Sequence, residues 1–139
     1  MNSKISDRAG AKFSRNVIIL IIIMIVNVVV IILLTPIGFE TRPQSALKPL
    51  GYIAITTIFV GLALDVASIV LLFKRVRVRS ASSLAIISSV LFLLVVFVDR
   101  TGSFFSVPIP PAINTLEFLF TAVLLVTLFV ASWVYRGSK

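Results

Sequence analysis

Four long apolar segments constrain this chain more than any other feature. They run from Val17 to Leu34, from Leu50 to Phe73, from Ala81 to Val98 and from Ala112 to Tyr135. A helix needs about 20 apolar residues to cross a hydrocarbon core about 30 Å thick, and each segment is close to that length. Inside hydrocarbon a chain must satisfy its backbone polar groups internally, as a helix does. We therefore predict an all-α integral membrane protein with four transmembrane helices.

The composition leaves little outside the membrane. The chain has 139 residues, of which 59% are hydrophobic, and its mean hydropathy is +1.16. Soluble domains are about half apolar, so a water-soluble core of this size could not hide the excess. Because the four crossings use most of the chain, we predict a single membrane domain over residues 1–139.

Basic residues gather in alternate gaps between the segments, and this bias predicts the orientation. The N-terminal segment, the loop between the second and third segments and the C-terminal segment together hold ten Lys and Arg residues, whereas the other two loops hold three: Arg42, Lys48 and Arg100. The positive-inside rule then predicts that both termini are cytoplasmic. Short loops between four crossings predict an antiparallel bundle. We expect the plasma membrane of a prokaryote.

Local signals predict where the first helix begins and ends. Residues 1–16 are polar, and we expect a frayed, solvated N-terminus in preference to a helix lying on the membrane surface. At the other end, Thr35-Pro36-Ile37-Gly38 is expected to end the helix, because the residue before a proline disfavours the helical conformation and glycine permits a turn.

Asp65 is the main candidate for a functional group. It lies fifteen residues into the second segment and nine before the basic loop that follows. An ionised carboxylate at the bilayer centre costs about 3 kcal/mol on insertion scales. The side chain must therefore face protein or water, find a partner or remain protonated. Helical spacing aligns Asp65 with Thr57, Gly61 and Ser68 in a small, polar stripe that lets another helix approach closely.

Three further candidate residues lie within the crossings. Glu117 is about one and a half turns into the fourth segment, Asn114 is one turn before it, and Asn27 is near the middle of the first segment. One hypothesis is that these residues and Asp65 fix helix register; another is that they relay protons or cations; a third is contact with a partner subunit or cofactor. Their sparse and staggered positions favour the first.

Two loops are candidates for contact with partners or lipid. Lys74, Arg75, Arg77 and Arg79 alternate with valine after the second segment. They are typical of a stop-transfer block, and docking to anionic lipid or an acidic partner is the alternative.

The loop from Thr101 to Asn114 contains Phe104 and Phe105 and three stiffening prolines. Such a loop is expected to lie on the membrane surface, to cover the mouth of the bundle or to pack on another subunit.

Several classes of function are excluded or disfavoured. The chain has no Cys and no His, which excludes disulfides and thiolate catalysis and disfavours most zinc sites. It contains no nucleophile with a general base and no phosphate-binding glycine loop. We expect no cofactor and no enzyme activity from this chain alone. The chain has a net charge of +8, and its basic residues flank the apolar segments. This placement indicates contact with lipid headgroups, so we expect no nucleic-acid partner.

These observations predict a small non-catalytic subunit that packs within and stabilises a larger membrane complex, such as an energy-transducing or membrane-oxidation complex. The assignment to that kind of complex is a class-level expectation and follows from no single residue. The alternative is a homo-oligomeric transporter or channel that couples to protons or cations through Asp65. A third possibility is a lipid-anchoring protein that uses the basic loop.

Overall fold

The computed structural model describes the backbone of residues 2–41 and 47–137, and the side chains of residues 15–37 and 47–137. The described backbone forms four helices: α1 (Asn2–Thr41), α2 (Pro49–Lys74), α3 (Val78–Arg100) and α4 (Pro111–Gly137). Each of them contains a stretch long and apolar enough to cross a membrane, and in α1 this stretch is Arg15–Ile37. The structure confirms the prediction of an all-helical chain with four helices of membrane length.

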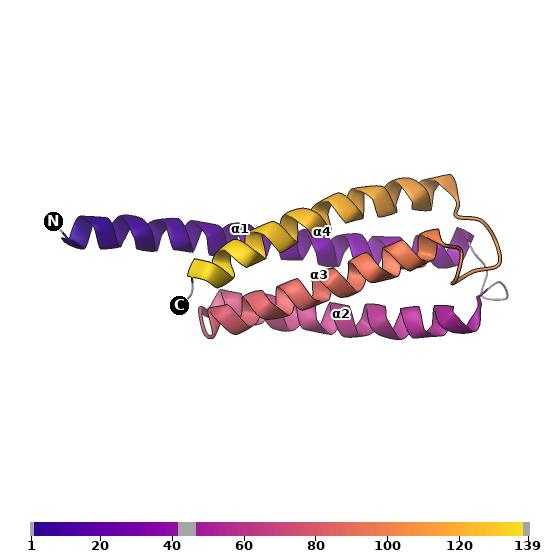
Figure 1. The fold of residues 1–139 in the computed structure, drawn as a ribbon, viewed down its shortest axis with the longest axis horizontal. Coiled ribbons are helices and arrows are strands. Elements are labelled where there is room, and N and C mark those ends of the chain that lie inside the picture. Colours follow the sequence, from indigo (N-terminus) through magenta and orange to yellow (C-terminus); the bar gives the residue numbers. More distant parts are fainter. Residues whose placement is uncertain (1, 42–46, 138–139) are drawn as a thin grey trace.

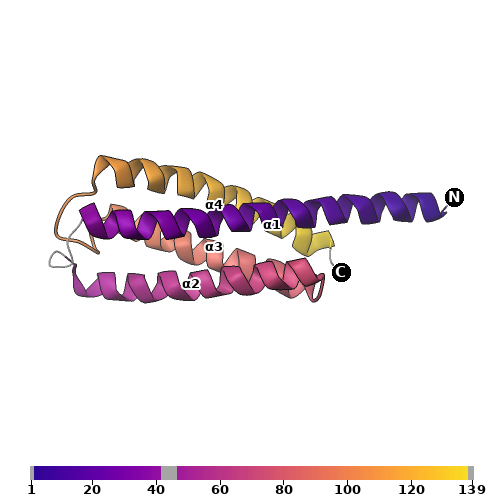
Figure 2. The same ribbon diagram turned by 180° about the vertical axis from the view of Figure 1, so that it is seen from behind.

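The four helices form a bundle in which the chain reverses direction from each helix to the next (Figure 1). α1 and α3 each pack against both α2 and α4. The marked N- and C-terminal ends lie toward one end of the bundle, and α1 projects beyond it (Figures 1 and 2). We call this the terminal end. The opposite end, which carries residues 101–110, is called the loop end.

α1 is longer in both directions than the sequence predicts. The helix begins at Asn2, so the expectation of a frayed N-terminus is wrong; adding residues to an existing helix avoids the cost of nucleation. The expected stop at Thr35–Gly38 is also wrong, because the helix continues through Pro36 to Thr41. Proline removes only one backbone donor, and membrane helices tolerate this loss when local groups compensate. The Thr35 hydroxyl donates to the Ile31 carbonyl at 2.8 Å, one residue before the Ile32 carbonyl that Pro36 leaves without an N–H donor.

The connection between α2 and α3 is a tight turn with two arginines in the left-handed region. Arg75 has φ 57° and Arg77 has φ 50°. The backbone N–H of Arg75 donates to Leu72 at 3.1 Å and that of Val76 to Leu71 at 3.2 Å, which satisfies carbonyls at the end of α2. α3 then begins at Val78, three residues before the predicted start of the third crossing.

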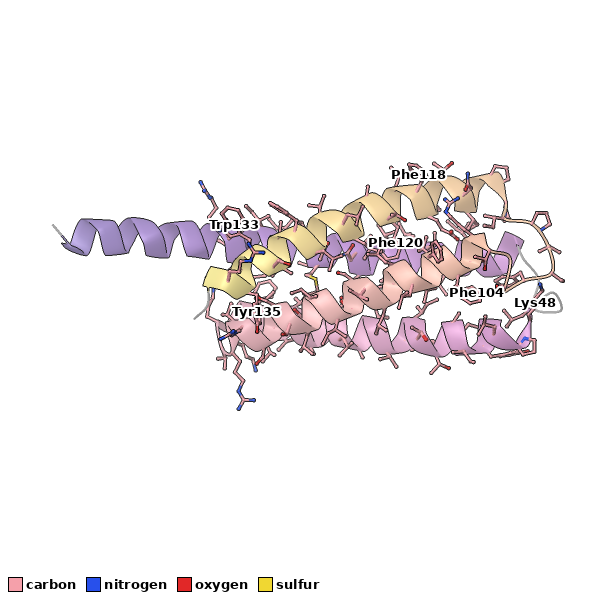
Figure 3. All side chains as sticks on the ribbon, in the orientation of Figure 1. Lys48, Phe104, Phe118, Phe120, Trp133 and Tyr135 are labelled. Atoms are coloured by element: carbon pink, nitrogen blue, oxygen red, sulfur yellow. The ribbon has the colours of Figure 1, made fainter. Side chains whose placement is uncertain are left out.

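At the loop end, the connection between α3 and α4 is fastened to the start of α2. Leu47 and Phe105 form an antiparallel bridge, and the Lys48 backbone N–H donates to the Phe104 carbonyl at 2.7 Å. The Lys48 ammonium donates to the Gly102 carbonyl at 3.0 Å. Phe104 is 7% exposed and points into the bundle (Figure 3). Of the three roles expected for this loop, its packing corresponds to covering the mouth of the bundle.

Candidate functional site

The interior of the bundle contains two separate apolar cores. The terminal-end core consists of Val17, Leu20, Ile21, Met24, Leu72, Ala81, Ala85, Ala131 and Val134. The loop-end core consists of Ile31, Phe92, Val96, Phe120 and Leu124. Within the latter, the rings of Phe92 and Phe120 pack at a tilt of 54° with their centroids 5.7 Å apart. The two cores together contain residues from all four helices.

A polar layer separates these cores, and every helix contributes to it. The layer consists of Asn27 of α1, Asp65 of α2, Ser88 and Ser89 of α3, and Thr127 of α4, each of them at most 1% exposed. In α1, for example, Asn27 lies between Met24 of one core and Ile31 of the other. Each of the four helices therefore places at least one buried polar side chain between the same two cores.

Hydrogen bonds across the polar layer join the helices in pairs. The Asn27 amide donates to the Thr127 hydroxyl at 2.8 Å, which links α1 to α4. The Ser88 hydroxyl hydrogen-bonds to Asp65 Oδ1, which links α3 to α2. Buried hydrogen bonds of this kind hold membrane helices in register, each contributing about 0.6–2 kcal/mol.

The surroundings of Ser88 accommodate a neutral Asp65. Ser88 Oγ is within hydrogen-bond distance of Asp65 Oδ1 and lies 3.1 Å from the Ala85 carbonyl oxygen. A hydroxyl has one hydrogen, so it donates to one of these acceptors at a time. If Asp65 is protonated, its O–H donates to Ser88 and Ser88 donates to Ala85, so that both contacts are satisfied at once. A charged Asp65 leaves one of them unmade.

The layer also holds polar atoms with unused hydrogen-bonding capacity. Among the described residues, Asn27 Oδ1, Asp65 Oδ2 and Ser89 Oγ are buried without a hydrogen-bond partner. Buried groups of this kind are commonly satisfied by ordered water.

Close approach of α3 to α2 is possible because Gly61 has no side chain. A Cβ atom at this position would lie 2.6 Å from Cζ of the Phe92 ring. Gly61, Asp65 and Ser68 are buried on the same face of α2. Thr57 was expected to share this face, but it is half-buried and its hydroxyl donates to the Ile53 carbonyl of its own helix at 2.8 Å.

Among the side chains that the structure describes, two acidic ones lie apart from the polar layer, toward the loop end. Glu117 of α4 is 2% exposed and Asp99 of α3 is 5% exposed. Both line an otherwise apolar cavity of about 490 Å³ between the helices. Each has an interaction partner of its own. The described residues contain no group of three or more His, Cys, Asp or Glu side chains that could hold a metal ion.

The remaining predicted residues fall at different places. Ser68 is buried and its hydroxyl donates to the Ala81 carbonyl at 2.7 Å, another link between α2 and α3. Asn114 is exposed and accepts a hydrogen bond from Arg100 only through its backbone carbonyl, at 3.3 Å. The four basic residues of the α2–α3 turn are exposed: Lys74, Arg75, Arg77 and Arg79.

Ser88, Ser89, Thr127 and Asp99 were not predicted as site residues. The available signal was the serine pair within the apolar third segment and the lone threonine late in the fourth, each of which lies at helical spacing from buried positions.

At the terminal end, the Arg79 guanidinium lies 4.5 Å from the centroid of the Tyr135 ring (Figure 3). This contact ties the start of α3 to the end of α4.

No protein-family model, curated protein or solved structure matches the chain. The fold and the site therefore define the protein only as a class, a bundle of four helices that are long and apolar enough to span a membrane.

Proposed function

We propose that this chain is a non-catalytic membrane subunit that packs within a larger membrane protein complex and stabilises it. In this proposal the helices cross a prokaryotic plasma membrane as an antiparallel bundle, with both termini and the basic α2–α3 turn in the cytoplasm. The positive-inside bias of the sequence supports this orientation. The pairing of Asn27 with Thr127 and of Asp65 with Ser88 supports a packing role, because each pair joins two helices.

Support for a partner comes from the outer face of α4. Phe118, Phe129 and Trp133 are 72%, 67% and 52% exposed, and helical spacing puts them on one side of the helix. Phe120, two residues after Phe118, points inward and is 3% exposed (Figure 3). Lipid provides no hydrophobic driving force between helices, so association depends on van der Waals packing, to which aromatic side chains contribute large contact areas. The occupant we propose for this face is a transmembrane helix of a partner subunit.

The test is purification from the native membrane in mild detergent, followed by mass measurement of the intact assembly. Stoichiometric recovery of another membrane protein is expected, with its loss in the double variant Phe129→Leu/Trp133→Leu. Phe97→Leu is the matched control, because Phe97 is 69% exposed on α3. Recovery of the chain alone or only as a homo-oligomer would contradict the proposal, and so would a double variant that keeps its partner.

A second candidate is a proton-coupled transporter that acts as a homo-oligomer. The arrangement of Ser88 between Asp65 and the Ala85 carbonyl favours it, because this arrangement suits a carboxyl group that gains and loses a proton. Reconstituted vesicles under a pH gradient would then show proton flux that Asp65→Asn abolishes and Ser68→Ala preserves. Equal flux from wild-type and Asp65→Asn vesicles would exclude this candidate.

A further inference from the structure

The cavity at the loop end has the properties of a binding site for a hydrocarbon chain. Its volume of about 490 Å³ is far larger than the voids of well-packed interiors. It also lies within the range of about 300–1,000 Å³ that is typical of small-molecule sites. All four helices contribute to its wall, which is formed mainly by aliphatic and aromatic side chains.

Phe104 and its neighbours cover the cavity toward the loop end. Phe104 lies over it and is 7% exposed. Backbone contacts with the start of α2 hold this covering segment, namely the Lys48–Phe104 hydrogen bond of 2.7 Å and the bridge between Leu47 and Phe105. Gly51 fits under it because a Cβ atom there would lie 2.8 Å from the Phe104 carbonyl oxygen. Entry from the aqueous side is therefore obstructed.

The cavity opens sideways, between α1 and α2. Most of its lining residues from α3 and α4, such as Phe92 and Phe120, are buried and form the back wall, whereas Ile32 of α1 and Phe59 of α2 are 56% and 66% exposed at its edge. α1 and α2 also make the least extensive contact among the neighbouring pairs. Figure 2 shows the bundle from the side on which these two helices lie. In a membrane this opening faces acyl chains.

We propose that the cavity binds one acyl chain of a membrane phospholipid, which enters between α1 and α2. The opening faces lipid while Phe104 covers the loop end, so the ligand comes from the bilayer. The polar side chains of the cavity lie toward the loop end, where the headgroup of such a lipid would be, and the side chains that lie deeper, where its acyl chain would be, are apolar. Asp99 of α3 and Glu117 of α4 line the part nearer the loop end and the headgroup level, whereas Leu62 and Phe92 line the deeper part. The proposal is independent of any partner subunit.

Lipid retention by the purified full-length chain tests the proposal. We expect native mass spectrometry in mild detergent to find one phospholipid per wild-type chain. Ala54→Phe should reduce occupancy at least tenfold, because Ala54 is 7% exposed and its new ring would fill the cavity. Ala122→Phe makes the same change on the exposed face of α4 and should leave occupancy unchanged. Ile58→Phe fills the cavity from the next turn of α2, which keeps the test decisive if Ala54→Phe does not fold.

Three results would overturn the proposal. One is a wild-type chain that retains no phospholipid or only detergent. Another is wild-type occupancy in the folded Ala54→Phe or Ile58→Phe variant. The third is retention of a hydrophobic molecule without an acyl chain, if its occupancy falls in these two variants and remains in Ala122→Phe.

Discussion

Gly61 allows the packing of α3 on α2 to be tested quantitatively. In Gly61→Ala, the new methyl group would lie 2.6 Å from Cζ and 2.9 Å from Cε1 of Phe92, which is too close for the present geometry. Overpacking of this kind costs about 1–3 kcal/mol. The higher helix propensity of alanine returns at most about 1 kcal/mol. With the full return, Gly61→Ala should lower the free energy of unfolding by up to about 2 kcal/mol, with about 1 kcal/mol as the central expectation.

A double-mutant cycle attributes this loss to the Phe92 ring. Phe92→Leu alone loses the ring contact with Phe120, which is worth about 0.5–1.5 kcal/mol beyond its buried area. In the Phe92→Leu background the ring is absent, so Gly61→Ala should cost less than about 0.5 kcal/mol and the coupling energy should be about 1 kcal/mol. The measurement is unfolding in mixed micelles by SDS titration, followed by far-UV circular dichroism.

The control is a larger side chain on the other side of α2. Ala63 is exposed, and Ala63→Leu should change the free energy of unfolding by less than about 0.5 kcal/mol. If Gly61→Ala costs the same with and without the Phe92 ring, the close approach described here is wrong. A Gly61→Ala variant that is more stable than the wild type would refute it as well.

Three further predictions concern the hydrogen bonds, the turn and the topology. Thr127→Val should destabilise the chain by about 1 kcal/mol in the same titration, because it leaves the Asn27 amide unpaired. Thr127→Ser keeps the hydroxyl and should retain most of the stability. Equal stability of the two variants would contradict this prediction. Arg75→Gly should stabilise the chain by about 1 kcal/mol by relieving φ 57°, whereas Arg75→Gln, which retains the strain and removes the charge, should not. A stabilising Arg75→Gln would point to charge instead. The chain has no Cys, so a single introduced Cys can be labelled specifically. In the proposed topology, Ser103→Cys should react with an impermeant maleimide in intact cells, and Ser80→Cys only after permeabilisation. The reverse pattern would mean that the proposed orientation is inverted.

The sequence predicts the helices and the burial of Asp65 because one physical constraint dominates both. Hydrocarbon requires internally hydrogen-bonded backbone, and it penalises an outward-facing carboxylate. Asn27, Glu117 and Ser68 are buried for the same reason. The prediction failed at Pro36, where the local preference to end a helix is weaker than the cost of exposing backbone groups beside lipid.

The cavity, and the contacts that hold the segment around Phe104 over it, could not be predicted because they depend on contacts between distant segments. The loop that contains Phe104 was expected to lie on the membrane surface, to cover the mouth of the bundle or to pack on another subunit. The observed arrangement depends on a hydrogen bond from the Lys48 backbone to the Phe104 carbonyl. The pairing of Asn27 with Thr127, one hundred residues later, is also not encoded in any local spacing. Spacing along one helix predicts which residues share a face, and not the depth at which two helices meet.

The adjacent serines of α3 provide a matched comparison for the polar layer. Ser88 contacts Asp65, whereas Ser89 Oγ has no hydrogen-bond partner among the described residues, and both are buried. Ser88→Ala should lower the free energy of unfolding by about 1 kcal/mol, because it leaves the Asp65 carboxyl without this contact. Ser89→Ala removes an unsatisfied group and should be neutral or stabilising by up to about 1 kcal/mol. If Ser89→Ala is instead as destabilising as Ser88→Ala, the Ser89 hydroxyl has a partner, and an ordered water bound by Asn27 and Asp65 becomes part of the layer that holds the helices together.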